Sequence, residues 1–162
     1  MKHFIAIDGH SGAGKTHIAS LLAERIGGTV FKLDDFGNDF DPFVGIPLLI
    51  EELRKIDSGI VIYEGVGVFD KRFDEFKAFR IFINTSEPIR DNRVRNRDLT
   101  REDRSAEDWQ RVFAIWEKPE KDYFDSGIKE SADLIINNDN GVLILSLIIY
   151  KNFGPMINRV FI

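Results

Sequence analysis

A short glycine-rich loop near the start of the chain constrains the fold more than any other feature. Residues 9–16 read GHSGAGKT, which fits the pattern G-x-x-x-x-G-K-[S/T] without a mismatch. The loop follows an apolar run at residues 4–7 and precedes an amphipathic helix, so backbone N–H groups and the helix N-terminus converge on an anion. Lys15 can reach the outer phosphates of a nucleotide, and the Thr16 hydroxyl can bind Mg²⁺. The sequence therefore predicts a nucleoside triphosphate site formed by Gly9, His10, Ser11, Gly12, Ala13, Gly14, Lys15 and Thr16.

The remaining apolar pattern predicts the fold around this loop. Short apolar runs recur at residues 60–63, 81–83 and 134–136, with a weaker one at 30–33, and each is separated by enough chain for a helix. Such runs are typical of strands buried on both faces of a parallel sheet. We expect one α/β domain over residues 1–162, with a doubly wound, mainly parallel five-stranded sheet and helices on both faces. The pattern does not decide between helix and strand for residues 142–149.

Sequence signals also mark the helix ends. Gly27 and Gly28 are expected to stop the first helix, and a second helix is predicted over residues 46–56. Ser86 before Glu87 and Pro88 predicts a third helix, to about residue 97. A capping box at residues 105–108 opens a fourth, which Pro119 should kink or end.

Composition excludes several classes of protein. The chain has no cysteine, which rules out disulfides, thiolate zinc sites and cysteine nucleophiles. Its formal net charge of -5 argues against a protein built to hold nucleic acid. No apolar run approaches the length of a membrane span. We expect a cytoplasmic protein whose partners are a nucleoside triphosphate and a small molecule, with no nucleic acid or membrane; the oligomeric state and the choice between ATP and GTP stay open.

Acidic residues follow the second and third predicted strands. Asp34 and Asp35 come after one strand and Glu64 after the next, so all three should lie near the glycine-rich loop. Phosphoryl transfer to an alcohol needs a carboxylate that orients the hydroxyl group and Mg²⁺ that neutralises the phosphates. We assign Asp34 as the acceptor-orienting base and Asp35 as an alternate or structural acid. The candidate Mg²⁺ ligands are Thr16, Glu64 and Asp34. Asp8 is expected to fix the geometry of the loop.

Arginines concentrate between residues 90 and 111, where interleaved acids nearly cancel their charge. A nucleic acid backbone would favour a less compensated surface. A lid that closes over a nucleotide fits better, and we place it at residues 98–106. Arg93 and Arg97 are the candidate catalytic arginines, and together with Arg101 they are expected to bind the nucleotide.

Aromatic residues near the strand ends are candidates for an acceptor pocket. Phe36, Phe40 and Phe69 are predicted to line it together with Asp35, although core packing is the competing explanation for each phenylalanine.

Four segments together resemble the uridine kinase-like branch of small P-loop kinases: the loop GHSGAGKT, LDDFG at 33–37, YEGVGVF at 63–69, and R-x-x-x-R-D at 93–98. The resemblance covers about residues 4–137, and residues 116–124 also resemble small bacterial kinase-like proteins. It implies that Asp34 is the catalytic base, that Glu64 assists Mg²⁺, and that Arg93 and Arg97 belong to a lid. Gly37 stands where the nucleoside kinases of the family carry tyrosine, and residues 40–56 are shorter than their nucleoside-binding region. The resemblance therefore implies kinase chemistry more strongly than uridine as the substrate.

Two functions are compatible with these features. The first is an ATP- and Mg²⁺-dependent kinase that phosphorylates a hydroxyl group of a small metabolite. A nucleoside is the leading acceptor, and dephospho-coenzyme A, nicotinamide riboside, a sugar and a shikimate-like alcohol remain open. The second is a nucleotide-binding switch or regulatory ATPase without a small-molecule acceptor. Residues 137–140 read NNDN and lack the lysine of the guanine-recognition sequence N-K-x-D, and the third strand ends in Glu-Gly, which favours the kinase.

Overall fold

The computed structural model describes residues 2–38, 41, 43–99 and 105–139. Within them, five parallel strands form one sheet in the order β2-β3-β1-β4-β5. β1 spans Lys2–Asp8, β2 Thr29–Lys32, β3 Gly59–Glu64, β4 Phe79–Asn84 and β5 Leu134–Asn137. This arrangement confirms the predicted doubly wound α/β fold, and every predicted strand forms.

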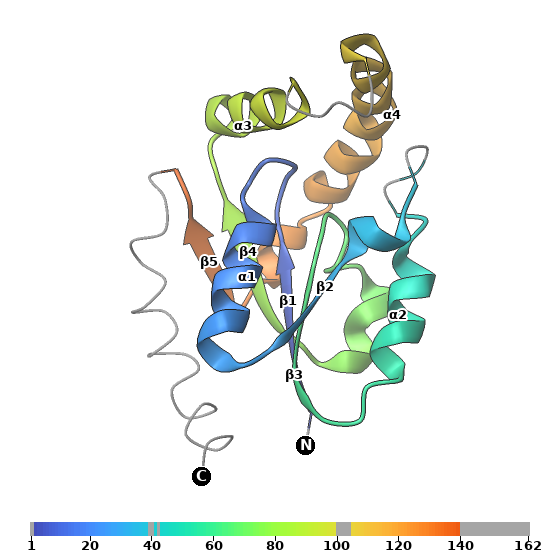
Figure 1. The fold of residues 1–162 in the computed structure, drawn as a ribbon, viewed down its shortest axis with the longest axis vertical. Coiled ribbons are helices and arrows are strands. Elements are labelled where there is room, and N and C mark those ends of the chain that lie inside the picture. Colours follow the sequence, from blue (N-terminus) through green and yellow to red (C-terminus); the bar gives the residue numbers. More distant parts are fainter. Residues whose placement is uncertain (1, 39–40, 42, 100–104, 140–162) are drawn as a thin grey trace.

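Helices connect the strands and extend beyond the sheet (Figure 1). α1 spans Lys15–Ile26, α2 Ile46–Arg54, α3 Glu87–Leu99 and α4 Ala106–Asp125. Short 3₁₀ helices are η1 Leu33–Phe36, η2 Lys71–Phe76 and η3 Ile128–Ser131. Figure 1 shows α3 and the first half of α4 above the carboxyl ends of the strands, with α1 and α2 beside the sheet. The fold therefore leaves the carboxyl ends of β1, β2 and β3 facing α3 and α4.

Two hydrophobic clusters cover the two faces of the sheet. On one face, α1 packs against alternate strand residues such as Ile5, Ile62 and Ile83. On the other, α2 and η2 pack against the intervening residues, including Ala6 and Tyr63. The alternation follows from the two-residue period of a strand. α2 buries Ile46, Leu49, Ile50 and Leu53, and each such side chain contributes about 1.5–3 kcal/mol on burial.

The register aligns the functional ends of the strands. Glu64 pairs with Ile7 of β1 on one side and with Lys32 of β2 on the other. Because Lys32 precedes η1, the acids of η1 and Glu64 both lie at the edge where the glycine-rich loop leaves β1.

The helix ends at Gly27 and Ser105 agree with the sequence signals. Gly27 ends α1 in the left-handed conformation, and the Ser105 side chain accepts a hydrogen bond from the Asp108 N–H at the start of α4. α4 does not end at Pro119 but continues to Asp125. Pro119 lacks only the hydrogen bond to the carbonyl of Ile115, which lies on an exposed part of the helix where water can replace it.

Some predictions fall on residues outside the described ranges. They are Phe40, Arg101, the middle of the proposed lid at residues 98–106, and the tail from residue 140. No helix in the described parts of the chain is long and apolar enough to cross a membrane.

Candidate active site

The loop of residues 9–16 joins β1 to α1, and its glycines meet geometric needs that other residues cannot. Gly9 has φ +148°, and a Cβ there would lie 2.4 Å from the carbonyl oxygen of Ile83. Gly12 has φ +76°, and a Cβ would lie 2.6 Å from the carbonyl oxygen of Arg90. Both contacts are with backbone, so neither neighbour can move aside easily. β4 and α3 therefore hold the loop closely from outside.

Lys15 is held inside the loop. Its side chain is buried, and its Nζ donates to the carbonyl oxygens of Gly9 at 2.8 Å and His10 at 3.0 Å. The His10 carbonyl also accepts from the N–H of Ala13 at 3.1 Å. The ammonium group thus lies at the mouth of the loop, where outer phosphates of a nucleotide would lie.

Thr16 and Glu64 form the second element of the site. The Thr16 hydroxyl donates to Glu64 Oε1 at 2.6 Å, although the two residues come from α1 and β3. Glu64 is 4% exposed. Burial raises the pKa of Glu64 above its usual range, while the hydrogen bond from Thr16 and the charge of Lys15 partly oppose this shift. A cation next to Glu64 would relieve the cost of burying its charge.

Asp34 lines the same pocket from η1, and its charge contributes to the raised pKa of Glu64. Asp35 is exposed and is not among the residues that line the pocket. Successive residues of a tight 3₁₀ turn point in different directions, so only one acid of the pair can face the loop.

The predicted phenylalanine wall of the acceptor pocket is not where the sequence placed it. Phe69 is 2% exposed and packs in the core against Phe82, and Phe36 packs against the same core cluster. Neither lines the pocket. Burying these rings within the apolar cluster outweighs exposing them to a cavity.

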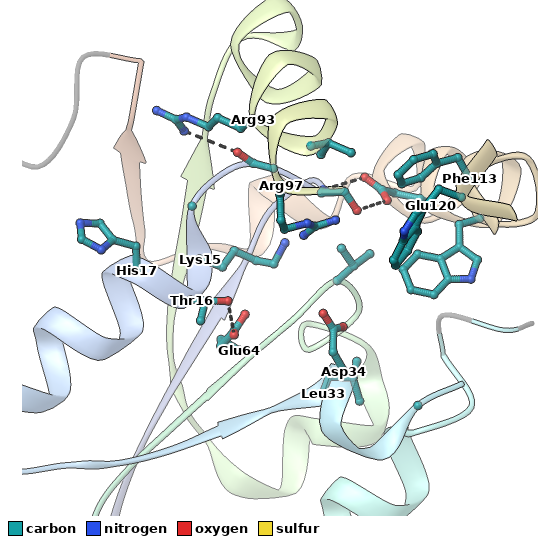
Figure 2. A pocket seen from close by; sticks show the side chains of 18 of the residues that line it. Lys15, Thr16, His17, Leu33, Asp34, Glu64, Arg93, Arg97, Phe113 and Glu120 are labelled. Atoms are coloured by element: carbon teal, nitrogen blue, oxygen red, sulfur yellow. Dashed lines mark hydrogen bonds between the residues drawn. The ribbon is translucent and has the colours of Figure 1, made fainter. Parts of the chain in front are cut away.

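The predicted arginines divide between two tasks. Arg93 lines the pocket, but its guanidinium donates to the Asn138 carbonyl at 2.9 Å and to the Ala13 carbonyl at 3.4 Å. Arg93 therefore supports the outer side of the loop in this structure and does not point its donors at a transferring phosphate. Arg97, one turn further along α3, points into the pocket (Figure 2).

Asp8 anchors the start of the loop. It is fully buried, and its carboxylate accepts from the Gly9 N–H at 2.7 Å, the Phe69 N–H at 2.9 Å and the Tyr123 hydroxyl at 2.6 Å. Burial raises the pKa of Asp8, while the hydrogen bond from Tyr123 opposes the shift. Asp8 thus links β1, the segment after β3 and α4.

Sequence reasoning did not assign the contribution of α4 to the site. Trp109, Phe113, Trp116 and Glu120 follow one another at i, i+4, i+7 and i+11, and all four line the pocket. Trp109 stacks on Phe113 with ring centroids 5.9 Å apart. The helical spacing was a detectable signal, but a stripe of aromatic residues on a helix is more often core than pocket.

Glu120 reaches the loop itself. Its Oε1 accepts from the Ser11 N–H at 2.9 Å, and its Oε2 accepts from the Ser11 hydroxyl at 2.7 Å. His10 Nδ1 lies 3.3 Å from Oε1. Burial raises the pKa of Glu120, but the hydrogen bonds from His10 and Ser11 outweigh it, and the net effect lowers the pKa to about 2.

These residues enclose a cavity of about 450 Å³ above the loop. Figure 2 shows Lys15, Thr16 and Glu64 on one side of it and Phe113 and Glu120, from α4, on another. The cavity extends beyond the loop to Asp34 and Asn38.

The oxygen atoms at Thr16 and Glu64 suit Mg²⁺. Magnesium prefers oxygen ligands and usually keeps several waters, so one hydroxyl and one or two carboxylates are a sufficient protein contribution. Among the described residues, no group of three or more histidine or acidic side chains is arranged to hold a metal ion. The Thr16 hydroxyl and the Glu64 carboxylate fit a Mg²⁺ ion whose other ligands would be water and phosphate oxygens.

Comparisons with known proteins identify the fold. No family model matches the chain, and no curated protein matches it. Among solved structures, a shikimate kinase from Acinetobacter baumannii in complex with shikimate has a TM-score of 0.59 at 16% identity, covering 100% of this chain and 97% of that one. A shikimate kinase from Bacteroides thetaiotaomicron has a TM-score of 0.56 at 16% identity over 95% of this chain and 98% of its own. An uncharacterized protein from Eubacterium ventriosum has a TM-score of 0.61 at 19% identity, over 92% and 97%.

These likenesses show that the chain has the fold of small P-loop kinases. Sequence identities this low indicate a shared fold but do not identify the substrate. The resemblance to uridine kinase-like enzymes stays a prediction.

Proposed function

We propose that this protein is an ATP- and Mg²⁺-dependent kinase that transfers the γ-phosphoryl group to a hydroxyl group of a small metabolite, with a nucleoside as acceptor. One observation carries the proposal. A single pocket holds Lys15 and Thr16 of the phosphate loop, the strand-end acids Asp34 and Glu64, and open space beyond them bounded by the aromatic face of α4. A pure nucleotide switch needs the first two parts but not the third.

The residues divide the work as follows. The loop N–H groups and Lys15 hold the outer phosphates, and Arg97 reaches the transferring group. Thr16 and Glu64 would hold Mg²⁺, which neutralises charge on the phosphates when bound. Asp34 orients the acceptor hydroxyl group and accepts its proton. Arg93 helps to hold the loop by donating to the Ala13 carbonyl in the loop and to the Asn138 carbonyl after β5.

The wall of the pocket favours a flat and uncharged acceptor. Trp109, Phe113 and Trp116 offer ring faces on which a base can stack. Asp34 of η1 and Glu120 of α4 also line the pocket, and their charges would disfavour a carboxylate on the acceptor. A nucleoside fits this wall better than a carboxylate-bearing alcohol such as shikimate.

An acceptor panel tests the proposal. The protein is incubated with Mg²⁺ and either ATP or GTP, together with uridine, other nucleosides, nicotinamide riboside, dephospho-coenzyme A, sugars or shikimate, and release of the nucleoside diphosphate is measured. Orotidine is the matched control for uridine, because it adds one carboxylate to the same ring. We expect release stimulated by a nucleoside and not by orotidine or shikimate. Diphosphate release that no acceptor stimulates would favour the switch.

A further inference from the structure

We propose that Glu120 is a positioning residue that orients the phosphate loop for transfer. It also couples that loop to the aromatic wall of α4, which consists of Trp109, Phe113 and Trp116. The part of the proposal that concerns transfer rests on the proposed function. The part that concerns binding and coupling does not, and it can be tested without any acceptor.

Glu120 binds the N–H end of the peptide group that joins His10 to Ser11 in the loop. Its carboxylate takes both the N–H and the hydroxyl of Ser11, and its side chain is only 14% exposed. The Ser11 N–H is partly buried, and an unpaired N–H costs about 1–3 kcal/mol where water cannot reach it, so this group favours the orientation in which Glu120 accepts from it.

The other end of that peptide group reaches Lys15. The carbonyl of the peptide is that of His10, which accepts from Lys15 Nζ at 3.0 Å and from the Ala13 N–H at 3.1 Å. The peptide group is planar, so fixing its N–H also fixes its carbonyl. Glu120 therefore acts on the phosphate-binding lysine through one peptide plane, without touching the lysine.

The same turn of α4 makes two further contacts with the loop region. Tyr123 donates to Asp8 at 2.6 Å, and the ring of Phe124 lies 3.8 Å from that of His10, measured between centroids. Trp116 lies one turn before Glu120 on the same face. One helix thus connects the aromatic wall to the loop. Binding of an anion in the loop should therefore change the environment of the aromatic side chains.

The Glu120 carboxylate positions the loop, but its charge also disfavours the binding of phosphates. Glu120 stays ionised at neutral pH, and its negative charge lies next to a loop that binds phosphates. A positioning residue of this kind weakens nucleotide binding while it aids transfer, which a residue that only stabilises the fold would not do.

Two substitutions separate charge from orientation. Glu120→Gln keeps an oxygen for the Ser11 N–H but removes the charge, so we expect it to bind ADP about 3- to 10-fold more tightly than the wild type. Glu120→Ala removes the acceptor too, and should bind ADP about 10-fold more weakly than Glu120→Gln. Glu117→Gln, an exposed acid one turn earlier on α4, is the matched control and should bind as the wild type does. Titration calorimetry below the melting temperature of every variant measures these affinities. Equal affinities for the two Glu120 variants would overturn the orientation role.

Tryptophan emission tests the tie to α4. The chain has two tryptophans, and both, Trp109 and Trp116, lie in the aromatic wall. Tripolyphosphate with Mg²⁺ has no base that could stack on the wall, so any change of emission reports coupling from the loop. We expect a change in the wild type and in Glu117→Gln, and a loss of at least half of it in Glu120→Ala at saturating tripolyphosphate. Glu120→Asp keeps the charge but withdraws the carboxylate, and serves the same purpose if Glu120→Ala fails to fold. An undiminished change in these variants would overturn the proposal.

Once an acceptor is known, kinetics add a third measurement. Glu120→Ala should lower kcat about 10²-fold at saturating substrates, whereas Glu120→Gln should lower it less and reduce the KM for ATP. Unchanged kcat in both would reject a role in transfer and leave the acceptor panel as the separate judge of the proposed function.

Discussion

The two halves of the pocket are built in different ways. The donor half consists of one continuous segment, residues 9–16, supported by β4 and α3 from outside. The half that we propose for the acceptor combines η1 and the face of α4, which lie far apart in the sequence. The first half is a local structure that a short motif encodes, and the second exists only once the chain has folded.

The difference shows most clearly in the residues that link the halves. Asp8 and Glu120 both connect α4 to the loop. Asp8 accepts a hydrogen bond from Tyr123 of α4, and Glu120 of α4 accepts one from Ser11 of the loop. Asp8 is fully buried and Glu120 is partly buried, and each accepts several hydrogen bonds. Burial prevails in raising the pKa of Asp8, whereas the hydrogen bonds prevail in lowering that of Glu120. Substitutions in the two halves of the pocket should therefore change different measured properties of the protein.

The largest effect is expected at Asp34. Asp34→Asn should retain nucleotide affinity but lose about 10²- to 10⁴-fold in transfer rate, because the amide cannot accept the proton of the acceptor. Asp35→Asn is a matched control, since its carboxylate is exposed and outside the pocket. Initial rates of ADP release measure both. A rate in Asp34→Asn close to that of the control would contradict the assignment of the base.

A somewhat smaller loss is expected on the donor side at Arg97. Arg97→Ala should lower kcat by about 10²- to 10³-fold, as expected when one donor to the transition state is removed. Arg95→Ala, on an exposed part of the same helix, should have little effect. Steady-state kinetics with saturating ATP distinguish the two, and equal rates would reject Arg97 as the catalytic arginine.

A change in the acceptor wall should affect acceptor binding more than donor binding. Phe113→Ala should raise the KM for the acceptor about 10-fold and leave the Kd for ADP nearly unchanged, because a stacked ring contributes about 1–3 kcal/mol. Ile115→Ala, on the exposed side of α4, controls for loss of helix stability. A parallel loss of ADP affinity would mean that the wall belongs to the nucleotide site.

The smallest effect is one of stability. The pKa of Glu64 is raised in the folded protein, so its favourable contribution is present below about pH 4.5, the usual value, and is lost as the pH rises. Glu64→Gln should therefore raise the Tm of the ligand-free protein at pH 7, where the wild type buries a charged carboxylate.

The same substitution should remove the stabilisation that Mg²⁺ and ADP together provide, because the ion loses its charged ligand. Differential scanning calorimetry at pH 4 and pH 7 measures both effects. A lower Tm at pH 7 in Glu64→Gln would show that the Thr16 hydrogen bond outweighs the burial of the charge.

Local patterns predicted much of the fold and the donor half. The apolar runs predicted all five strands, and Gly27 and Ser105 predicted a helix end and a helix start, because each signal depends on neighbours along the chain. At Pro119 the sequence predicted a kink or an end, and the helix does not end there. Whether a helix continues past proline depends on what its later turns contact, and here those turns hold Glu120 and Tyr123.

The sequence by itself determined that this chain carries a phosphate loop with acids at neighbouring strand ends, since a motif and an apolar period are readable without coordinates. Only the tertiary structure decided that Arg93 contacts the loop while Arg97 faces the pocket, that Phe69 belongs to the core, and that aromatic residues of α4 line the pocket. The physical reason is that these outcomes depend on packing between segments distant in sequence, where burial and competing hydrogen bonds select one of several positions that the local pattern allows equally.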